Sequence, residues 1–222
     1  MYFAGSRTVQ ATTSNVITSL IFNPECYKKL RNEIDPFMDR VKDDIMGNMK
    51  LEDLEELEYT KLCYQESMRI CAPAQSSSTS CVNKDVTISG VDMKKGDAFY
   101  IMLQYIHWDP RQWREPKKFV PERFDADSEW YKTPSGEKRK AFSFVPFLGG
   151  SRVCLGKTFA EITLKFMIPL WYHAFDFELV KEEHKKNQPY VLTAATKAEL
   201  IPIKLTTRNK ITAPKPTEKL SQ

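Results

Sequence analysis

One segment of this chain, residues 144–162, constrains its fold more than any other because it presents a single thiol between a tight turn and a helix. It reads FVPFLGGSRVCLGKTFAEI, with Cys154 among the glycines Gly149, Gly150 and Gly156. Glycine lets the backbone turn sharply and lets a bulky flat group approach it closely. A cysteine just before a helix meets unpaired backbone N–H groups and the positive end of the helix dipole, and both favour the thiolate. The segment therefore predicts a turn that offers a thiolate to a ligand.

The composition is that of a globular protein in a reducing compartment. The chain has 222 residues, 41% of them hydrophobic, which suffices for a core in one or two domains. Its net charge of +4 is too small to predict binding to nucleic acid or to a membrane surface. No run of about eighteen apolar residues exists, so no membrane segment is expected. The five cysteines include no CxxC pair, so neither a disulfide framework nor a zinc ribbon is indicated, and an intracellular location is expected.

Helical periodicity appears in four segments. They are residues 1–23, 23–41, 51–70 and 157–175. The third should stop near Cys71, where the proline- and serine-containing stretch CAPAQSSSTS begins. In the fourth, one apolar stripe is expected to comprise Phe159, Ile162, Phe166 and Leu170. Pro169 should kink or end that helix, because proline lacks the backbone N–H and its ring clashes with the preceding turn.

The strand signals are weaker. Residues 85–107 carry β-branched and aromatic residues broken by Ser-Gly and Lys-Gly pairs, which is typical of short antiparallel strands. Residues 108–146 are rich in proline and aromatics and predict an irregular meander, and residues 175–180 and 198–207 are two further strand candidates. The polar residues 208–222 predict a disordered tail. The expected fold class is therefore mostly α with small β-sheets over residues 1–207.

The cysteine segment resembles a known family. FLGGSRVCLG fits the haem-binding loop FxxGxRxCxG of the cytochrome P450 family at each fixed position. The resemblance implies a haem (heme, iron protoporphyrin) whose iron is bound by the Cys154 thiolate. It also implies that Phe147 packs beside the sulfur, that Arg152 pairs with a haem propionate, and that Gly149 and Gly156 belong to the haem-binding loop. The alternative is a buried structural cysteine in a glycine-rich turn.

Two further motifs of the family occur in the expected order. Glu66 and Arg69 are three residues apart on a predicted helix and share a face, where an ion pair can form. Such a pair is commonly a solvated surface contact, but it resembles the family's ExxR motif, which an arginine from a downstream PERF segment completes. Here that segment is FVPERF, with Arg123. The resemblance implies one structural unit of Glu66, Arg69 and Arg123 behind the haem.

The N-terminal segment FAGSRT resembles the oxygen-binding helix of the family. Ala4, Gly5 and Thr8 fall on one helical face, and the resemblance implies that Thr8 helps to deliver protons to bound dioxygen. Arg7 stands where the family commonly has an acid, and it cannot relay protons as a carboxylic acid can. Trp108 likewise stands where a basic residue is common.

The resemblance implies a haem-dependent monooxygenase. Such an enzyme inserts one atom of dioxygen into a small organic substrate with electrons from a redox partner such as a reductase. Substrate contacts are expected in residues 72–80 and 194–197, although ordinary solvent loops explain them equally well. The basic run EKRKAF could meet an acidic electron donor or could simply be solvated.

Two alternatives concern the function. The resemblance covers residues 2–207 but only about the C-terminal half of the family's catalytic domain. The first alternative is therefore a truncated, non-catalytic fragment that retains the haem-binding loop. Family members often reside on the endoplasmic reticulum membrane, but no anchor is expected in this chain. A zinc or simple thiol site is the second, and the scattered histidines His107, His173 and His184 give it no metal-ligand spacing.

Overall fold

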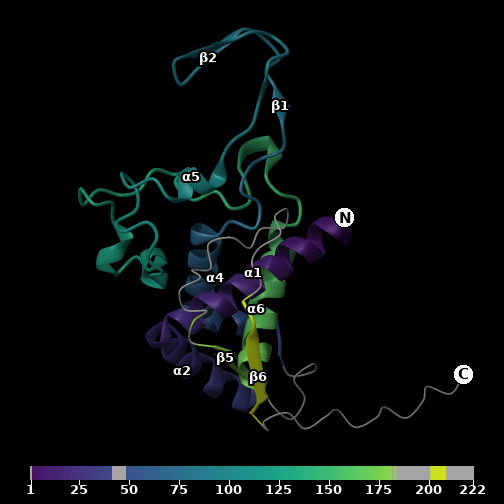
Figure 1. Ribbon diagram of the computed structural model, residues 1–222, viewed down its shortest axis with the longest axis vertical. Helices are drawn as coiled ribbons and strands as arrows, with labels where there is room; N and C mark the ends of the chain where they lie inside the picture. The colour runs from purple at the N-terminus through teal and green to yellow at the C-terminus, as the bar shows by residue number, and fades with distance from the viewer. Residues whose placement is uncertain (1, 42–48, 182, 184–200, 209–222) are drawn as a thin grey trace, which may run out of the picture.

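Four helices form the body of the molecule. The computed structural model describes residues 2–41, 49–181, 183 and 201–208. The helices of the body are α1 (Tyr2–Phe22), α2 (Pro24–Val41), α4 (Glu58–Ile70) and α6 (Lys157–Ala174). In Figure 1, α1 crosses α6, with α2 and α4 packed beside them. Residues at the centre are fully buried, among them Leu20, Leu30, Ile34 and Met38. The helices expected from the sequence are confirmed, and so is the mostly α fold class.

The third expected helix is divided in two by Leu57. A short 3₁₀ helix, η1 (Asp53–Glu56), precedes α4, and Leu57 between them has ψ of 64°, outside the helical region. Leu57 offers no side-chain cap to α4. The carboxylate of Glu33 on α2 accepts hydrogen bonds from the backbone N–H groups of Tyr59 and Thr60, at 2.6 and 2.8 Å. A neighbouring helix therefore caps α4, which no local sequence signal could indicate.

Helix α6 continues through Pro169, so of the two expected effects, a kink or an end of the helix, the end does not occur. The helix runs on to Ala174, and its buried stripe includes Leu164, Ile168 and Tyr172, each 1% exposed. Burial of that stripe offsets the backbone hydrogen bond that proline cannot form. The residues expected on one apolar face are not the buried ones, since Phe159 and Ile162 are exposed and Phe166 and Leu170 are half-buried.

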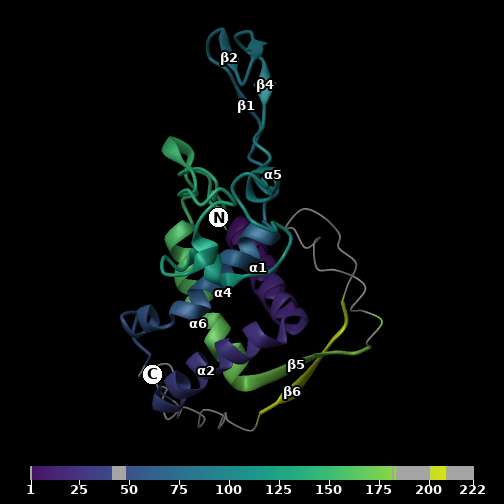
Figure 2. The same ribbon diagram turned by 90° about the vertical axis from the view of Figure 1, so that its left-hand side faces the viewer.

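Among the residues that the structure describes, the strands form three separate two-stranded antiparallel sheets. The pairs are β1 (Ser80–Cys81) with β4 (Ala98–Phe99), β2 (Val86–Ile88) with β3 (Val91–Met93), and β5 (Phe175–Leu179) with β6 (Ile203–Thr207). The first two sheets project from the helical body as an arm, as Figures 1 and 2 show. The third sheet lies beside the helices and continues directly from α6.

The last part of the expected strand region is helical instead. Leu103–His107 forms the short helix α5. Leu103, Gln104 and His107 are buried, at spacings of one and four residues, which suit a helical turn and not a strand. The irregular meander that follows contains the 3₁₀ turns η2 (Pro121–Phe124) and η3 (Glu129–Tyr131), and η4 (Gly150–Arg152) lies just before Cys154.

The first residue of the predicted tail is part of the folded body. Arg208 donates hydrogen bonds to the carboxylate of Asp35 on α2, at 2.7 and 2.9 Å. The backbone N–H of Arg208 donates to the carbonyl of Ala174 at 2.9 Å. The rest of the tail, residues 209–222, lies outside the described residues. Within the described part of the chain, no helix is both long and apolar enough to span a bilayer.

Candidate functional site

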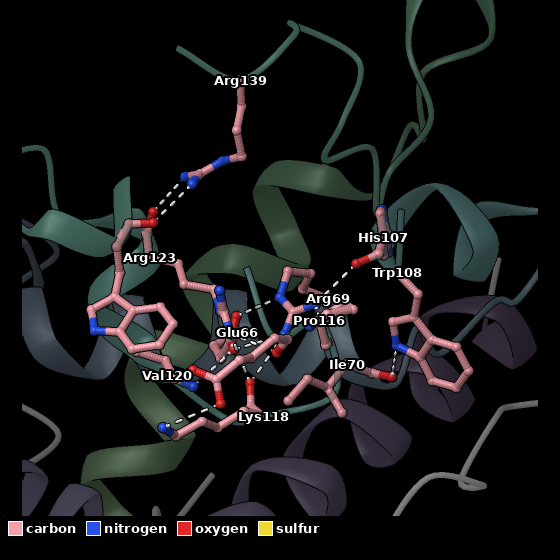
Figure 3. A network of polar contacts seen from close by, with 12 residues as sticks. Glu66, Arg69, Ile70, His107, Trp108, Pro116, Lys118, Val120, Arg123 and Arg139 are labelled. Carbon is pink, nitrogen blue, oxygen red and sulfur yellow. Dashed lines mark hydrogen bonds and ion pairs between the residues drawn. The ribbon is translucent and has the colours of Figure 1, made fainter. Parts of the chain in front are cut away.

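A fully buried ion-pair network joins α4 to the η2 turn. Arg69 donates to both carboxylate oxygens of Glu66, at 2.7 and 2.9 Å, and Arg123 donates to the same carboxylate at 3.1 Å. Glu66, Arg69 and Arg123 are all 0% exposed. The backbone N–H of Val120 adds a further hydrogen bond to Glu66 at 2.8 Å. Figure 3 shows how the side chains converge, so the structure brings together the three residues that the sequence motifs single out.

The network holds two arginines and one glutamate, and backbone carbonyls accept from the donors of Arg69 that do not bind Glu66. Arg69 donates to the carbonyls of His107, Pro116 and Lys118, at 2.9, 2.6 and 3.3 Å. Together with the two bonds to Glu66, these use each of the five N–H donors that a guanidinium carries. Arg123 donates to the carbonyl of Glu115 at 2.9 Å. Such saturation is required for buried charge, because an unpaired buried ion costs several kcal/mol.

A third arginine, Arg139, completes the network, and sequence reasoning missed it. It lies in the basic run EKRKAF, which we treated as solvated or partner-binding. Arg139 instead turns inward and donates to the backbone carbonyls of Arg123 and Trp130. Its guanidinium also lies 4.3 Å from the centroid of the buried Trp113 ring, which Arg69 approaches at 5.0 Å. Burial lowers the pKa of Arg139 to about 10, so it remains charged at neutral pH.

His107 connects this network to the cysteine loop. Its carbonyl accepts from Arg69, and its imidazole Nε2 accepts from the backbone N–H of Val145 at 3.0 Å. The His107 ring also packs against Phe144, with centroids 5.3 Å apart. Burial, with a smaller contribution from the charge of Arg69, lowers the pKa of His107 to about 3, so the ring is neutral and can accept. The sequence placed no function on this residue.

The cysteine loop is a tight turn closed by its own backbone. The N–H of Cys154 donates to the carbonyl of Phe147 at 2.8 Å, and the carbonyl of Cys154 accepts from Lys157, the first residue of α6, at 3.2 Å. Gly150 has φ of +65°, a conformation that glycine adopts without strain, and Leu148 adopts φ of +61° despite its side chain. A Cβ at Gly149 would lie only 3.3 Å from the Phe142 ring, so glycine leaves room for that ring.

The loop exposes its thiol, a set of apolar side chains and a cationic side chain. Cys154 is a free thiol and is exposed. Large apolar side chains in the neighbouring sequence are exposed, namely Phe142 70%, Val153 49%, Leu155 84%, Phe159 63% and Ile162 37%. Such a set of exposed apolar side chains indicates a surface that a ligand or partner covers. Arg152 is exposed and forms no ion pair within the described part of the chain, so its charge is available to an anionic group. These residues fit a flat apolar ligand with acidic substituents.

Three of the predicted site residues lie on α1, near the start of α6. A Cβ built at Gly5 would lie 3.9 Å from the ring of Phe159, so this part of α1 adjoins the exposed apolar residues beyond Cys154. The Thr8 hydroxyl donates to the carbonyl of Ala4 at 2.8 Å. Thr8 is partly exposed, and Arg7 beside it is exposed. A hydroxyl in this position can exchange its internal hydrogen bond for one to a ligand.

Trp108 and Gln104 cap the end of α4 from α5. The indole N–H of Trp108 donates to the carbonyl of Ile70 at 3.1 Å. Gln104 donates to the carbonyls of Arg69 and Ile70 and accepts from the N–H of Ala72. The indole N–H of Trp108 therefore pairs with a carbonyl at the C-terminal end of α4 that has no partner within the helix. This contact gives a physical reason for a neutral hydrogen-bond donor at this position.

The predicted substrate segments are only partly described. Within residues 72–80, the N–H of Ser77 donates to the carbonyl of Ile101 at 2.8 Å and the Ser77 hydroxyl accepts from the N–H of Ile101, so this segment is paired with the chain before α5. Residues 194–197 lie outside the described residues. Among the residues that the structure describes, no group of three or more histidine, cysteine, aspartate or glutamate side chains could hold a metal ion.

Comparisons with known proteins agree with this arrangement. The chain is 31% identical over 180 residues to mouse cytochrome P450 3A11, an alignment that covers 81% of this chain and 33% of the relative. It is 33% identical over 182 residues to cytochrome P450 71A8 of Mentha piperita, covering 82% and 34%. It is 32% identical over 173 residues to berbamunine synthase of Berberis stolonifera, covering 76% and 33%. The chain thus spans about a third of the length of these relatives.

The family profile described as Cytochrome P450 matches residues 1–202, which include the Glu66 network, the PERF turn and the cysteine loop. That match extends over most of the 222 residues. The chain therefore belongs to the cytochrome P450 family.

Proposed function

We infer that this chain carries the haem-binding half of a monooxygenase site, in which Cys154 binds the haem iron. The observation that carries the proposal is the free, exposed thiol of Cys154 at the start of α6, in a closed turn with exposed apolar side chains around it. Thiolate is a ligand that haem iron accepts in this family. When bound, the haem would supply the activation of dioxygen for insertion of one oxygen atom into an organic substrate.

The chain's own residues have distinct parts in this proposal. Cys154 would hold the iron as an anionic sulfur, and Arg152 would bind an acidic substituent of the porphyrin. Phe147 accepts the Cys154 N–H through its carbonyl and so keeps the sulfur at the loop's tip. The Thr8 hydroxyl on α1 would help to deliver protons to dioxygen. Glu66, Arg69 and Arg123 would hold the fold and take no part in the chemistry.

The test uses haemin loading of the purified chain. The protein is loaded, reduced and exposed to carbon monoxide, and the red-shifted Soret band of thiolate ligation is expected. Cys154→Ala should abolish this band, whereas Cys81→Ala should leave it unchanged, because Cys81 is an exposed cysteine on the β1–β4 arm. A thiolate band that persists in Cys154→Ala would refute the ligand assignment.

A second candidate function is haem binding without turnover. It is favoured by Arg7, which lies exposed beside Thr8 and offers no carboxylic acid for proton relay. Oxygen-dependent product formation with a supplied reductase separates the two functions, and in a competent enzyme Thr8→Ala should uncouple oxygen consumption from product. A chain that shows the thiolate band but forms no product under these conditions would support the second candidate.

A further inference from the structure

The buried ion-pair network and the exposed cysteine loop are joined by one residue, His107, through its backbone carbonyl and its imidazole ring. Arg69 donates to the His107 carbonyl at 2.9 Å, and the imidazole of the same residue accepts from Val145 at 3.0 Å. His107 is 0% exposed. Val145 is only two residues before Phe147, whose carbonyl accepts from the N–H of Cys154. A short chain of hydrogen bonds and peptide links thus runs from Glu66 to the thiol.

Aromatic contacts reinforce this link on the same side. Phe144 packs against His107 with centroids 5.3 Å apart and against Phe124 of the η2 turn at 4.7 Å. Phe124 directly follows Arg123, a member of the network. These contacts are apolar and non-directional, so they hold the segments close together but do not orient them. The hydrogen bond between His107 and Val145 supplies a fixed direction at the entrance to the loop.

The chemistry of the His107 ring suits this role. The ring must be neutral for Nε2 to accept, and its proton must then sit on Nδ1. Neither phenylalanine nor protonated histidine could accept from Val145. Glutamine can place an amide oxygen close to the position of Nε2, so it preserves the acceptor in a different side chain.

We propose that His107 is a positioning residue that transmits the placement of the Glu66–Arg69–Arg123 network to the cysteine loop and so holds Cys154 in register for its ligand. The role of Cys154 as a ligand rests on the proposed function, whereas the effect of His107 on the loop does not depend on it. The link is separable from the chemistry, because His107 contacts neither the thiol nor the exposed apolar side chains around it in any hydrogen bond or ring contact found among the described residues.

The first experiment measures amide hydrogen exchange in the ligand-free full chain. In the wild-type protein, the Val145 amide should be protected to a degree similar to the Val120 amide, which donates to Glu66. In His107→Phe, exchange at Val145 and Cys154 should accelerate by about tenfold, the effect of losing one hydrogen bond on an opening equilibrium. In His107→Gln it should return to within about twofold of wild type.

A matched control is provided by the next residue. Trp108→Phe removes the indole hydrogen bond to Ile70 at the end of α4 but leaves the Val145 contact in place. It should therefore leave exchange at Val145 and Cys154 unchanged. Equal acceleration in Trp108→Phe and His107→Phe would overturn the proposal, because it would indicate general loosening. If His107→Phe does not fold, the wild-type protein alone tests the link, through the comparison of the Val145 and Val120 amides. Exchange of the Val145 amide at the rate of an unbonded loop amide would then refute the link.

The second experiment uses the carbon monoxide complex of the haemin-loaded chain. His107→Phe should shift absorbance from the thiolate-ligated form toward a form without thiolate, and His107→Gln should restore the thiolate form. A normal thiolate band in His107→Phe, with unchanged exchange at Cys154, would refute the positioning role and leave the proposed function intact. Failure of the wild type to bind haem would refute the proposed function, while the exchange experiment would still test the link to the loop.

Discussion

The Glu66 network and the Cys154 loop both carry an arginine beside a motif residue, but the first is buried and the second is exposed. Glu66, Arg69 and Arg123 are fully buried, and their charges are satisfied by one another and by backbone carbonyls. Cys154 and Arg152 are exposed, and the polar contacts of the loop come from backbone groups. Groups whose partners are all internal hold a fold, whereas groups that the chain leaves exposed beside apolar side chains can hold a ligand. The difference in burial thus separates the buried structural motif from the loop that we propose binds haem.

The largest effect should come from removing the charge at the centre of the network. Glu66→Ala leaves Arg69 and Arg123 buried without their carboxylate and should destabilise the protein by about 3 to 5 kcal/mol. Urea unfolding measures this change. The control is Glu122→Gln, since Glu122 lies next to Arg123 but pairs with the exposed Lys29; it should cost less than about 1 kcal/mol. Equal costs for both variants would contradict the distinction between buried and exposed pairs.

Arg139 tests whether the network extends beyond the motif residues. Arg139→Met removes two hydrogen bonds to backbone carbonyls and the contact with the Trp113 ring. The expected cost is about 2 to 3 kcal/mol in the free energy of unfolding. Lys138→Met, in the same basic run but at an exposed position, should change it by less than about 0.5 kcal/mol. If the two substitutions have the same small effect, Arg139 belongs to the surface and not to the network.

The pH dependence of stability tests the neutral state of His107. Burial lowers its pKa from 6.5 to about 3, so the unfolded chain takes up a proton that the folded protein does not. The stabilisation is fully present above pH 6.5 and is lost as the pH falls from 6.5 toward 3. At pH 5 the loss should be about 2 kcal/mol.

Urea midpoints at pH 7 and pH 5 measure this loss, and the same pair in His107→Gln provides the control. The decrease between the two pH values should be smaller in the variant by about the amount attributed to His107. An identical decrease in both proteins would show that His107 is not the group responsible.

The smallest effect on stability should come from Cys154, the residue proposed to bind the haem iron. Cys154→Ala replaces an exposed side chain, so the free energy of unfolding should change by less than about 0.5 kcal/mol. The same variant is expected to abolish the thiolate band of the haem complex. A large loss of stability in Cys154→Ala would instead support the alternative of a structural cysteine.

Sequence motifs identified the network residues and the cysteine loop but not the side chains that connect them. Glu66, Arg69 and Arg123 fit the ExxR and PERF motifs, and the glycines around Cys154 predicted a turn. His107 and Arg139 carry no such signal, because their partners are backbone groups distant in sequence, such as the Val145 N–H and the Arg123 carbonyl. A single sequence does not reveal which carbonyl a guanidinium will meet. The sequence also did not reveal which face of α6 is buried, since hydrophobicity alone does not distinguish a core face from an apolar face that remains exposed beside the cysteine loop.

The sequence by itself determined the local features of this protein: the helices of the body, the turn before α6, the thiol it presents and the membership of the cytochrome P450 family. Each depends on residues close together in the chain. The tertiary structure alone decided that Glu33 of α2 caps α4, that α6 continues through Pro169, that Leu103–His107 is a helix and that His107 ties the ion-pair network to the loop. These features depend on burial and on hydrogen bonds between distant segments, whose free energies arise only when the elements pack together.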